Sequence, residues 1–66
     1  MTLRFCLIGA SHHPLVEVRV ASLAELHEML DRHRFVSGHL ADADEHGVQP
    51  AVLIATSRLQ MVIEAN

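Results

Sequence analysis

The 66-residue sequence has no lysine, tryptophan or tyrosine, only two phenylalanines and a single cysteine, Cys6. A lone cysteine excludes an intrachain disulfide, and without an export signal at the N-terminus it favours a cytoplasmic protein. No apolar run approaches the roughly 20 residues that a membrane-spanning helix needs. We therefore expect a small cytoplasmic protein with no membrane segment.

Nucleic-acid binding also has little support in the composition. The formal net charge is −3, and the five basic residues, all arginine, are scattered along the chain. Phe5 and Phe35 lie in apolar runs and are expected to be buried, where they could not stack on bases. The absence of lysine beside eight alanines fits the codon usage of a GC-rich bacterial or phage genome. We expect no direct nucleic-acid binding and a bacterial or phage source.

Small size and high apolar content together predict association with another chain. Half of the residues are hydrophobic, whereas a chain of this length buries only about 60% of the surface that its unfolded form exposes. Small domains often gain stability from a disulfide, a metal or a partner chain, and leftover apolar surface marks interfaces. We expect a single domain over residues 1–66 that forms a homodimer or binds another protein; ordinary apolar surface is the alternative.

Two strands are predicted in the first third of the chain. Residues 3–9 form a compact apolar run, and residues 15–20 alternate strictly, with Val16, Val18 and Val20 on one face. Glycine and proline mark a turn between the two segments. The segments are therefore close enough to pair as a hairpin.

A helix is predicted from Leu23 to about His33. Ser22 and Glu25 form a capping-box pattern, which satisfies backbone N–H groups at the start of a helix. The apolar residues that follow recur at helical spacing and form one stripe, made of Leu23, Leu26, Met29 and Leu30.

The rest of the chain is predicted to be mostly strand. Residues 34–40 form a third strand, in which Gly38 marks a bend or a close approach of another backbone, and residues 52–54 form a fourth. Residues 57–64 suit either a fifth strand or a helix, and their β-branched residues favour the strand. We expect an α+β domain, order β-β-α-β-β-β, with one helix packed on an antiparallel sheet of four to five strands.

The closing stretch, Val52 to Glu64, resembles the strand–short turn–strand ending of SH3-like and Sm-like small barrels. The helix expected between the strands departs from the usual order of elements in those families. The resemblance is confined to this ending, and we carry no function across.

The six histidines of this short chain suggest a metal site, but their spacing does not. They lie at positions 12, 13, 27, 33, 39 and 46, whereas zinc sites use three or four ligands arranged in close pairs. His27 and His33 would face away from each other on a helix, and Cys6 lies inside an apolar strand. We expect no metal and no cofactor; a homo-oligomeric ligand- or metal-binding protein that uses its histidines is the alternative.

No arrangement of residues indicates catalysis. The turn from Asp42 to Gly47 resembles the start of a calcium loop, but His46 stands where an oxygen ligand belongs, and the final glutamate is missing. Ser11 lies beside His12, but the sequence has no Gly-x-Ser-x-Gly elbow and no glycine-rich phosphate loop. We expect a non-enzymatic protein without catalytic residues.

Acidic side chains on the expected helix and in the turn after the third strand are the candidate partner-binding residues: Glu25, Glu28, Asp31, Asp42, Asp44 and Glu45. Such a surface can mimic nucleic acid and occupy the basic groove of a target, although solvated acidic faces of this kind are also ordinary. We therefore expect a small regulator, adaptor or inhibitor that acts through protein–protein contact. Blocking of a larger nucleic-acid-processing complex is included in this expectation.

Overall fold

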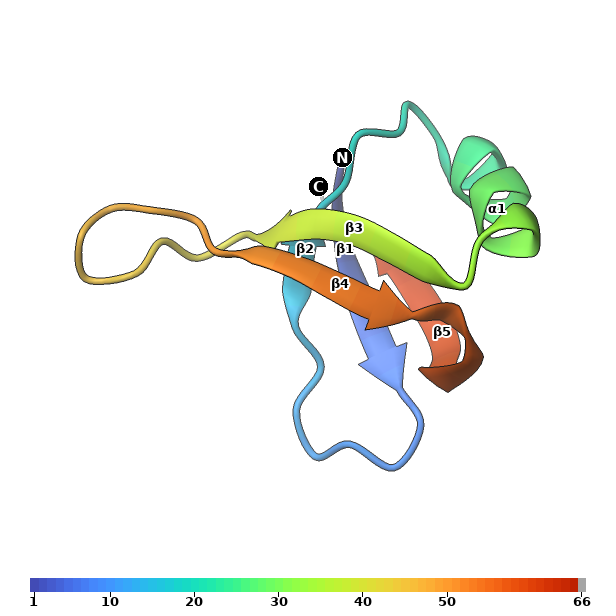
Figure 1. Ribbon diagram of the computed structural model, residues 1–66, viewed down its shortest axis with the longest axis horizontal. Coiled ribbons are helices and arrows are strands. Elements are labelled where there is room, and N and C mark those ends of the chain that lie inside the picture. Colours follow the sequence, from blue (N-terminus) through green and yellow to red (C-terminus); the bar gives the residue numbers. More distant parts are fainter. Residues whose placement is uncertain (66) are drawn as a thin grey trace.

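The computed structural model describes residues 1–65, which contain one α-helix and five strands (Figure 1). The elements follow one another as β1 (Thr2–Leu7), β2 (Leu15–Glu17), α1 (Leu23–Arg32), β3 (Phe35–Leu40), β4 (Ala51–Ala55), the short 3₁₀ helix η1 (Thr56–Arg58) and β5 (Leu59–Glu64). The predicted α+β class and the order β-β-α-β-β-β are confirmed.

The five strands form one antiparallel sheet in the order β4-β3-β2-β1-β5. The first four strands are neighbours in chain order, and β5 returns to pair with β1, for example Phe5 with Val62. The predicted hairpin of β1 and β2 is confirmed, and so is the choice of strand over helix for the closing segment. The strand–turn–strand ending of the chain is formed by β4, η1 and β5. β4 and β5 are the two edge strands of the sheet.

The helix begins at the predicted cap. Ser22 Oγ accepts the backbone N–H of Glu25 at 3.2 Å, and the Glu25 carboxylate accepts the N–H of Ala21 at 2.8 Å, one residue before the expected donor. At the other end, the N–H of His33 bonds to the carbonyl of Met29. Among residues 1–65, no helix has the length and apolar character needed to cross a membrane.

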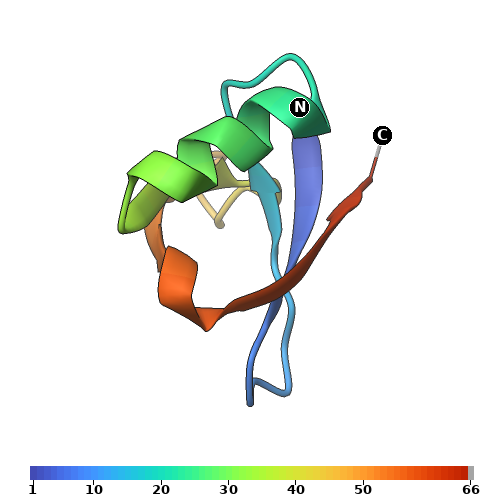
Figure 2. The same ribbon diagram turned by 90° about the vertical axis from the view of Figure 1, so that its right-hand side faces the viewer.

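The core lies between α1 and one face of the sheet (Figure 2). It consists of Leu3, Phe5, Val16, Val18, Val20, Leu26, Val36 and Ile54. The three alternating valines are all buried as predicted, although strand β2 is shorter than expected and ends at Glu17. Beyond it, the N–H of Val18 bonds to the carbonyl of Met1, and the N–H of Val20 bonds back to Val18, which turns the chain toward the helix.

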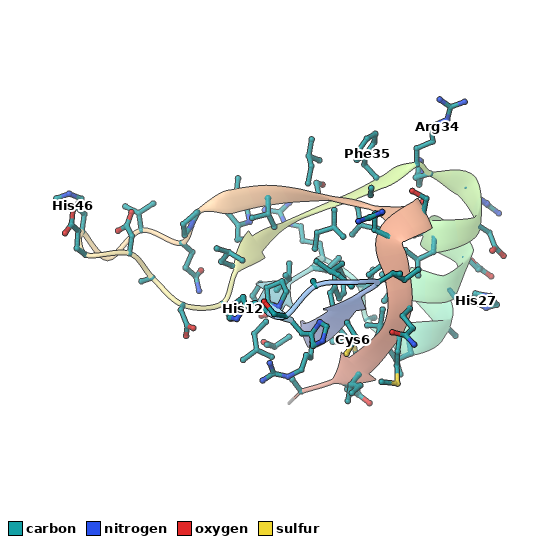
Figure 3. The ribbon with its side chains drawn as sticks, turned by 90° about the horizontal axis from the view of Figure 1, so that it is seen from below. Cys6, His12, His27, Arg34, Phe35 and His46 are labelled. Carbon is teal, nitrogen blue, oxygen red and sulfur yellow. The ribbon has the colours of Figure 1, made fainter. Side chains whose placement is uncertain are left out.

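The predicted burial of Phe35 is wrong. Its side chain is 55% exposed, because successive side chains of a strand point to opposite faces and the neighbouring Val36 takes the core side of β3. Figure 3 shows Phe35 on the outside of the sheet beside Arg34. Leu53 of the adjacent strand β4 is 70% exposed. The outer face of β3 and β4 is therefore partly apolar.

Gly38 lies where β2 and β3 approach most closely. A Cβ atom at this position would lie 2.6 Å from the carbonyl oxygen of Glu17 and 2.8 Å from Cγ1 of Val16. No side chain fits there unless the strands move apart. Of the two alternatives predicted for Gly38, a bend or a close approach, the structure shows the close approach, and the approaching strand is β2.

Candidate functional site

The helix packs on the sheet chiefly against β3 and leaves the rest of the sheet uncovered. Its ten residues span about 15 Å at the usual rise per residue. Leu26 alone of the apolar stripe is fully buried, whereas Met29 and Leu30 are partly buried and Leu23 is 40% exposed. A hollow is consequently left on each side of α1.

The first hollow, the α1–β5 groove, lies between α1 and the segment from η1 to β5; Figure 2 shows the ribbons of these two segments facing each other. It has a volume of about 520 Å³. Apolar side chains from both walls line it: Leu23, Leu26 and Leu30 of α1, and Leu59, Met61 and Val62 of β5. Met61 is 52% exposed, so the groove presents apolar surface to solvent.

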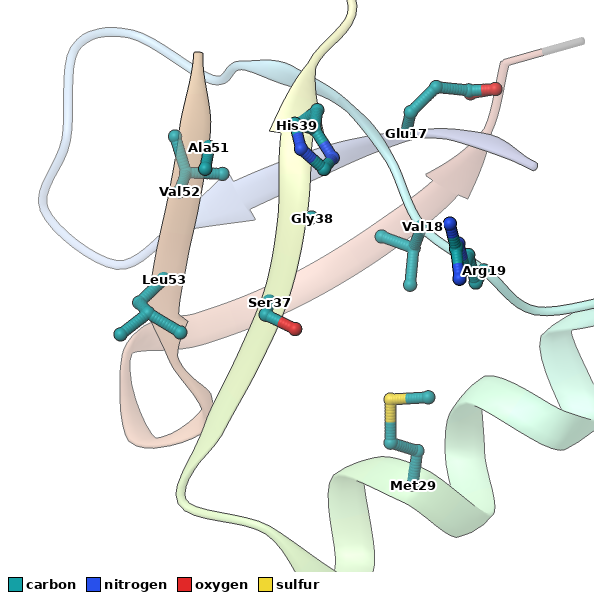
Figure 4. Close-up of a pocket in the computed structure, with 10 residues that line it drawn as sticks. All are labelled: Glu17, Val18, Arg19, Met29, Ser37, Gly38, His39, Ala51, Val52 and Leu53. Atoms are coloured by element: carbon teal, nitrogen blue, oxygen red, sulfur yellow. The ribbon is translucent and has the colours of Figure 1, made fainter.

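The second hollow, the β3 hollow, lies on the other side of α1, over β3 and the end of β2 (Figure 4). Its volume is about 670 Å³. Ser37 and His39 of β3, Met29 of α1 and Arg19 of the segment after β2 lie around it. Its lining therefore combines an apolar floor with a guanidinium and an imidazole.

Arg19 is the free cation of the β3 hollow. Among the described residues, its side chain makes no ion pair within 4.0 Å, and it is exposed. Glu17, the acidic residue of the same lining, already accepts a hydrogen bond from the Thr2 hydroxyl at 2.6 Å and lies 3.9 Å from the N-terminal ammonium. The hollow therefore offers positive charge to an anionic group.

The six acidic residues predicted to bind a partner fall into two groups that the structure does not bring together. All six are exposed. Glu25, Glu28 and Asp31 lie on α1, whereas Asp42, Asp44 and Glu45 lie in the loop 41–50, which projects from the opposite end of the molecule (Figures 1 and 3). They cannot form one continuous acidic surface.

Two of these carboxylates have local structural roles. Glu25 caps the helix through Ala21. Asp44 Oδ1 accepts the backbone N–H groups of His46 and Val48 at 2.8 and 3.0 Å, and so closes the turn at the tip of the loop. Asp31 lies 3.9 Å from His27, a residue of the α1–β5 groove, and therefore stands at the rim of that groove.

The histidines are spread over the whole molecule. Figure 3 shows His12, His27 and His46 far from one another. Within residues 1–65, no group of three or more histidine, cysteine, aspartate or glutamate side chains could hold a metal ion. Cys6 is buried in β1.

His13 has a structural role that the sequence did not reveal. Its Nδ1 accepts the backbone N–H of Leu7 at 3.1 Å. The pairing of β1 with β5 shifts register between Cys6 and Leu7, and a bulge of this kind leaves a backbone group without its regular strand partner. His13 supplies that partner from the turn between β1 and β2.

Sequence reasoning missed both hollows. The walls of the α1–β5 groove, Leu23 and Met61 among them, come from the middle and the end of the chain, and no local pattern joins them. Arg19 alternates with buried valines, and this pattern predicts only that its side chain lies on the solvent-facing side of a strand. The sequence around Phe35 is apolar, like that around a core residue, so its exposure could not be predicted from the sequence.

Comparisons of this chain with protein-family models, with curated proteins and with solved structures find no match. The function is therefore argued from the hollows, the exposed apolar side chains and the charges described above.

Proposed function

We propose that the protein is a non-enzymatic binding module that holds an apolar segment of another protein in the α1–β5 groove, and so acts as a regulator, adaptor or inhibitor. The observation that carries this proposal is the pair Leu23 and Met61. They stand 40% and 52% exposed on opposite walls of an apolar groove. Grooves of this type receive the apolar face of a partner helix.

The charge at the groove rim indicates the chemistry of that partner. Asp31 is exposed at the rim beside His27, and Glu28 is exposed on the same helix. Neither forms an ion pair with an arginine among the described residues. A partner segment that carries basic residues beside its apolar anchors would complement these carboxylates and associate faster at low salt.

Met61→Glu tests the groove, because Met61 is half exposed and a charge there leaves the core intact. Ile63→Glu is the matched control, since Ile63 lies on the same strand, is 45% exposed and does not line the groove. Partners that co-purify with the wild type from bacterial cells would be identified by quantitative mass spectrometry and measured again as purified pairs by calorimetry. We expect Met61→Glu to weaken binding at least about tenfold, because it buries an unpaired charge. Equal binding by both variants would contradict the groove as the site.

Mimicry of nucleic acid makes a different prediction. Asp42→Asn with Glu45→Gln removes two charges from the tip of the loop and spares Asp44, which closes the turn. If this double variant loses the partner while Met61→Glu retains it, the acidic loop is the binding surface. That result would favour inhibition of a nucleic-acid-processing complex.

A second candidate function, binding of a small anionic ligand, is favoured by Arg19 and His39, which both line the β3 hollow; Arg19 makes no ion pair with any of the described residues. The volume of about 670 Å³ falls in the range of small-molecule sites, about 300–1,000 Å³. Inorganic phosphate and citrate at millimolar concentration should then raise the melting temperature of the wild type and not of Arg19→Gln. An equal response of both proteins would count against this site.

A further inference from the structure

Strand β4 is an edge strand without the usual protection. Its five residues, Ala51–Ala55, are all apolar and include no charged residue and no proline, and its register with β3 shows no bulge. Across residues 1–65, no strand pairs with its outer edge. Natural edge strands normally carry charges, prolines or bulges that prevent pairing with another chain. β4 has none of these devices.

The hydrogen-bond pattern shows which backbone groups of β4 are free. The N–H of Leu40 bonds to the carbonyl of Pro50 at 2.9 Å, and the N–H of Thr56 bonds to the carbonyl of Arg34 at 2.8 Å. In an antiparallel pair, bonded and non-bonded residues alternate, so the even-numbered residues of this segment bond to β3. The N–H and C=O groups of Ala51 and Leu53 and the N–H of Ala55 therefore point to the open edge, whereas the carbonyl of Ala55, the N-cap of η1, accepts the first hydrogen bond of that 3₁₀ helix.

We propose that β4 pairs antiparallel with β4 of a second copy of this chain, about a two-fold axis at Leu53. The sequence of the strand, Ala-Val-Leu-Ile-Ala, has the same pattern of side-chain sizes in both directions. The pairing places Ala51 opposite Ala55, Val52 opposite Ile54, and Leu53 opposite itself. The free groups of residues 51, 53 and 55 then form about four backbone hydrogen bonds between the copies, two at the Leu53 pair and one at each pair of Ala51 with Ala55. This self-complementarity selects a second copy as the occupant of the edge.

The exposed apolar side chains around the edge support the same arrangement. Leu53, at the centre of β4, is 70% exposed, the most of any large hydrophobic residue among those described. Beyond the open edge is a hollow of about 260 Å³, whose far side carries Ile8, which is 48% exposed. In the proposed pair, the Leu53 side chains of the two copies lie opposite each other and cover each other.

Charges at the two ends of β4 are complementary in this arrangement. The loop 41–50, which carries Asp42 and Glu45, precedes β4. Arg58 of η1 follows β4. Arg34 also lies at that end of the strand, because its carbonyl accepts the N–H of Thr56. Figure 3 shows the loop and Arg34 at opposite ends of the molecule. An antiparallel pair reverses one copy on the other, so each acidic loop extends toward the arginines of the second copy. Opposite charges in such positions favour the correct register.

The dimer does not depend on the proposed function. No residue of β4 lines the α1–β5 groove, so each copy in the dimer keeps an open groove. Loss of the dimer and loss of groove binding are therefore separate outcomes.

Leu53→Lys tests the pairing, because it places two like charges directly opposite each other at the axis and alters a side chain that is already exposed. Ile63→Lys is the matched control on β5, the other edge of the sheet. In sedimentation equilibrium at about 50 µM, we expect the wild type and Ile63→Lys to have twice the mass of a single chain. Leu53→Lys should have the mass of one chain, with an unchanged circular dichroism spectrum.

A charge-reversal experiment tests the register. Mixing Leu53→Lys with Leu53→Glu should restore a dimer that contains one chain of each variant, because residue 53 then faces its opposite charge. A monomeric wild type, or a dimer that persists in Leu53→Lys, would overturn the proposal. Dissociation by Ile63→Lys as well would also overturn it, since β4 would then pair with β5 of the next copy.

Discussion

The substitution Gly38→Ala probes the closest approach between two strands in this fold. The new Cβ would lie 2.6 Å from the carbonyl oxygen of Glu17, 2.8 Å from Cγ1 of Val16 and 3.3 Å from Cγ2 of Val18. Carbon and oxygen atoms in neighbouring strands ordinarily stay about 3.3–3.6 Å apart. The first of these contacts is with backbone, so it cannot be relieved by rotating a side chain. β2 and β3 must therefore separate.

Two opposing effects set the size of the loss. Inserting a methyl group into a packed site typically costs about 1–3 kcal/mol. Replacing glycine by alanine also reduces the conformational entropy of the unfolded chain, which stabilises by about 0.4–1 kcal/mol where the backbone tolerates it. Gly38 does not have a positive φ, so this gain applies, and the steric cost exceeds it. We expect Gly38→Ala to lower the free energy of unfolding.

Urea denaturation followed by circular dichroism measures this loss, with all proteins at one concentration because a dimer makes stability depend on concentration. Ser37→Ala is the control: it lies next to Gly38 on β3, is exposed, and should change stability by less than about 0.5 kcal/mol. Equal midpoints for Gly38→Ala and Ser37→Ala would refute the reasoning. They would mean that β2 and β3 are not in the contact described.

Two further predictions concern the core and the hairpin. Leu26→Ala should lower the free energy of unfolding by about 2–5 kcal/mol, because Leu26 is 1% exposed in the centre of the core. Glu28→Ala, on the outer face of the helix, should change the free energy of unfolding by only a few tenths of a kcal/mol. If Glu28→Ala were the more damaging of the two, the buried face of the helix would be wrongly assigned. His13→Ala should cost about 1–3 kcal/mol by leaving the N–H of Leu7 without its acceptor. Native-state hydrogen exchange should then be faster at Leu7 than in the wild type, and an unchanged rate would show that this bond contributes little.

Patterns that act over a few residues were sufficient to predict the elements. Ser22 and Glu25 lie within one helical turn of each other, so their capping interaction is a local property, and α1 begins where they place it. The alternation of Val16, Val18 and Val20 likewise predicted which side chains are buried. A strand side chain has only two faces to choose from, so alternation gives burial directly at Val16; Val18 and Val20 are buried too, although they lie beyond the end of β2.

The candidate sites could not be predicted in this way. The α1–β5 groove exists because a ten-residue helix leaves part of the sheet uncovered, and its walls meet only after β5 has returned to pair with β1. Phe35 and Phe5 both lie in apolar runs, yet one is exposed and the other buried. The difference depends on which face of β3 the helix covers.

The amino-acid sequence by itself determined the helix, the strands and their alternating faces, because those follow from capping, periodicity and side-chain shape within short segments. It also marked Gly38 as a bend or a point of close approach. Only the tertiary structure decided that the approaching group is the carbonyl of Glu17, that His13 completes the backbone bonding at Leu7, and that β4 is an open edge. Each of these depends on which distant segments pair, and pairing is set by the burial of the whole core rather than by any one stretch of the chain.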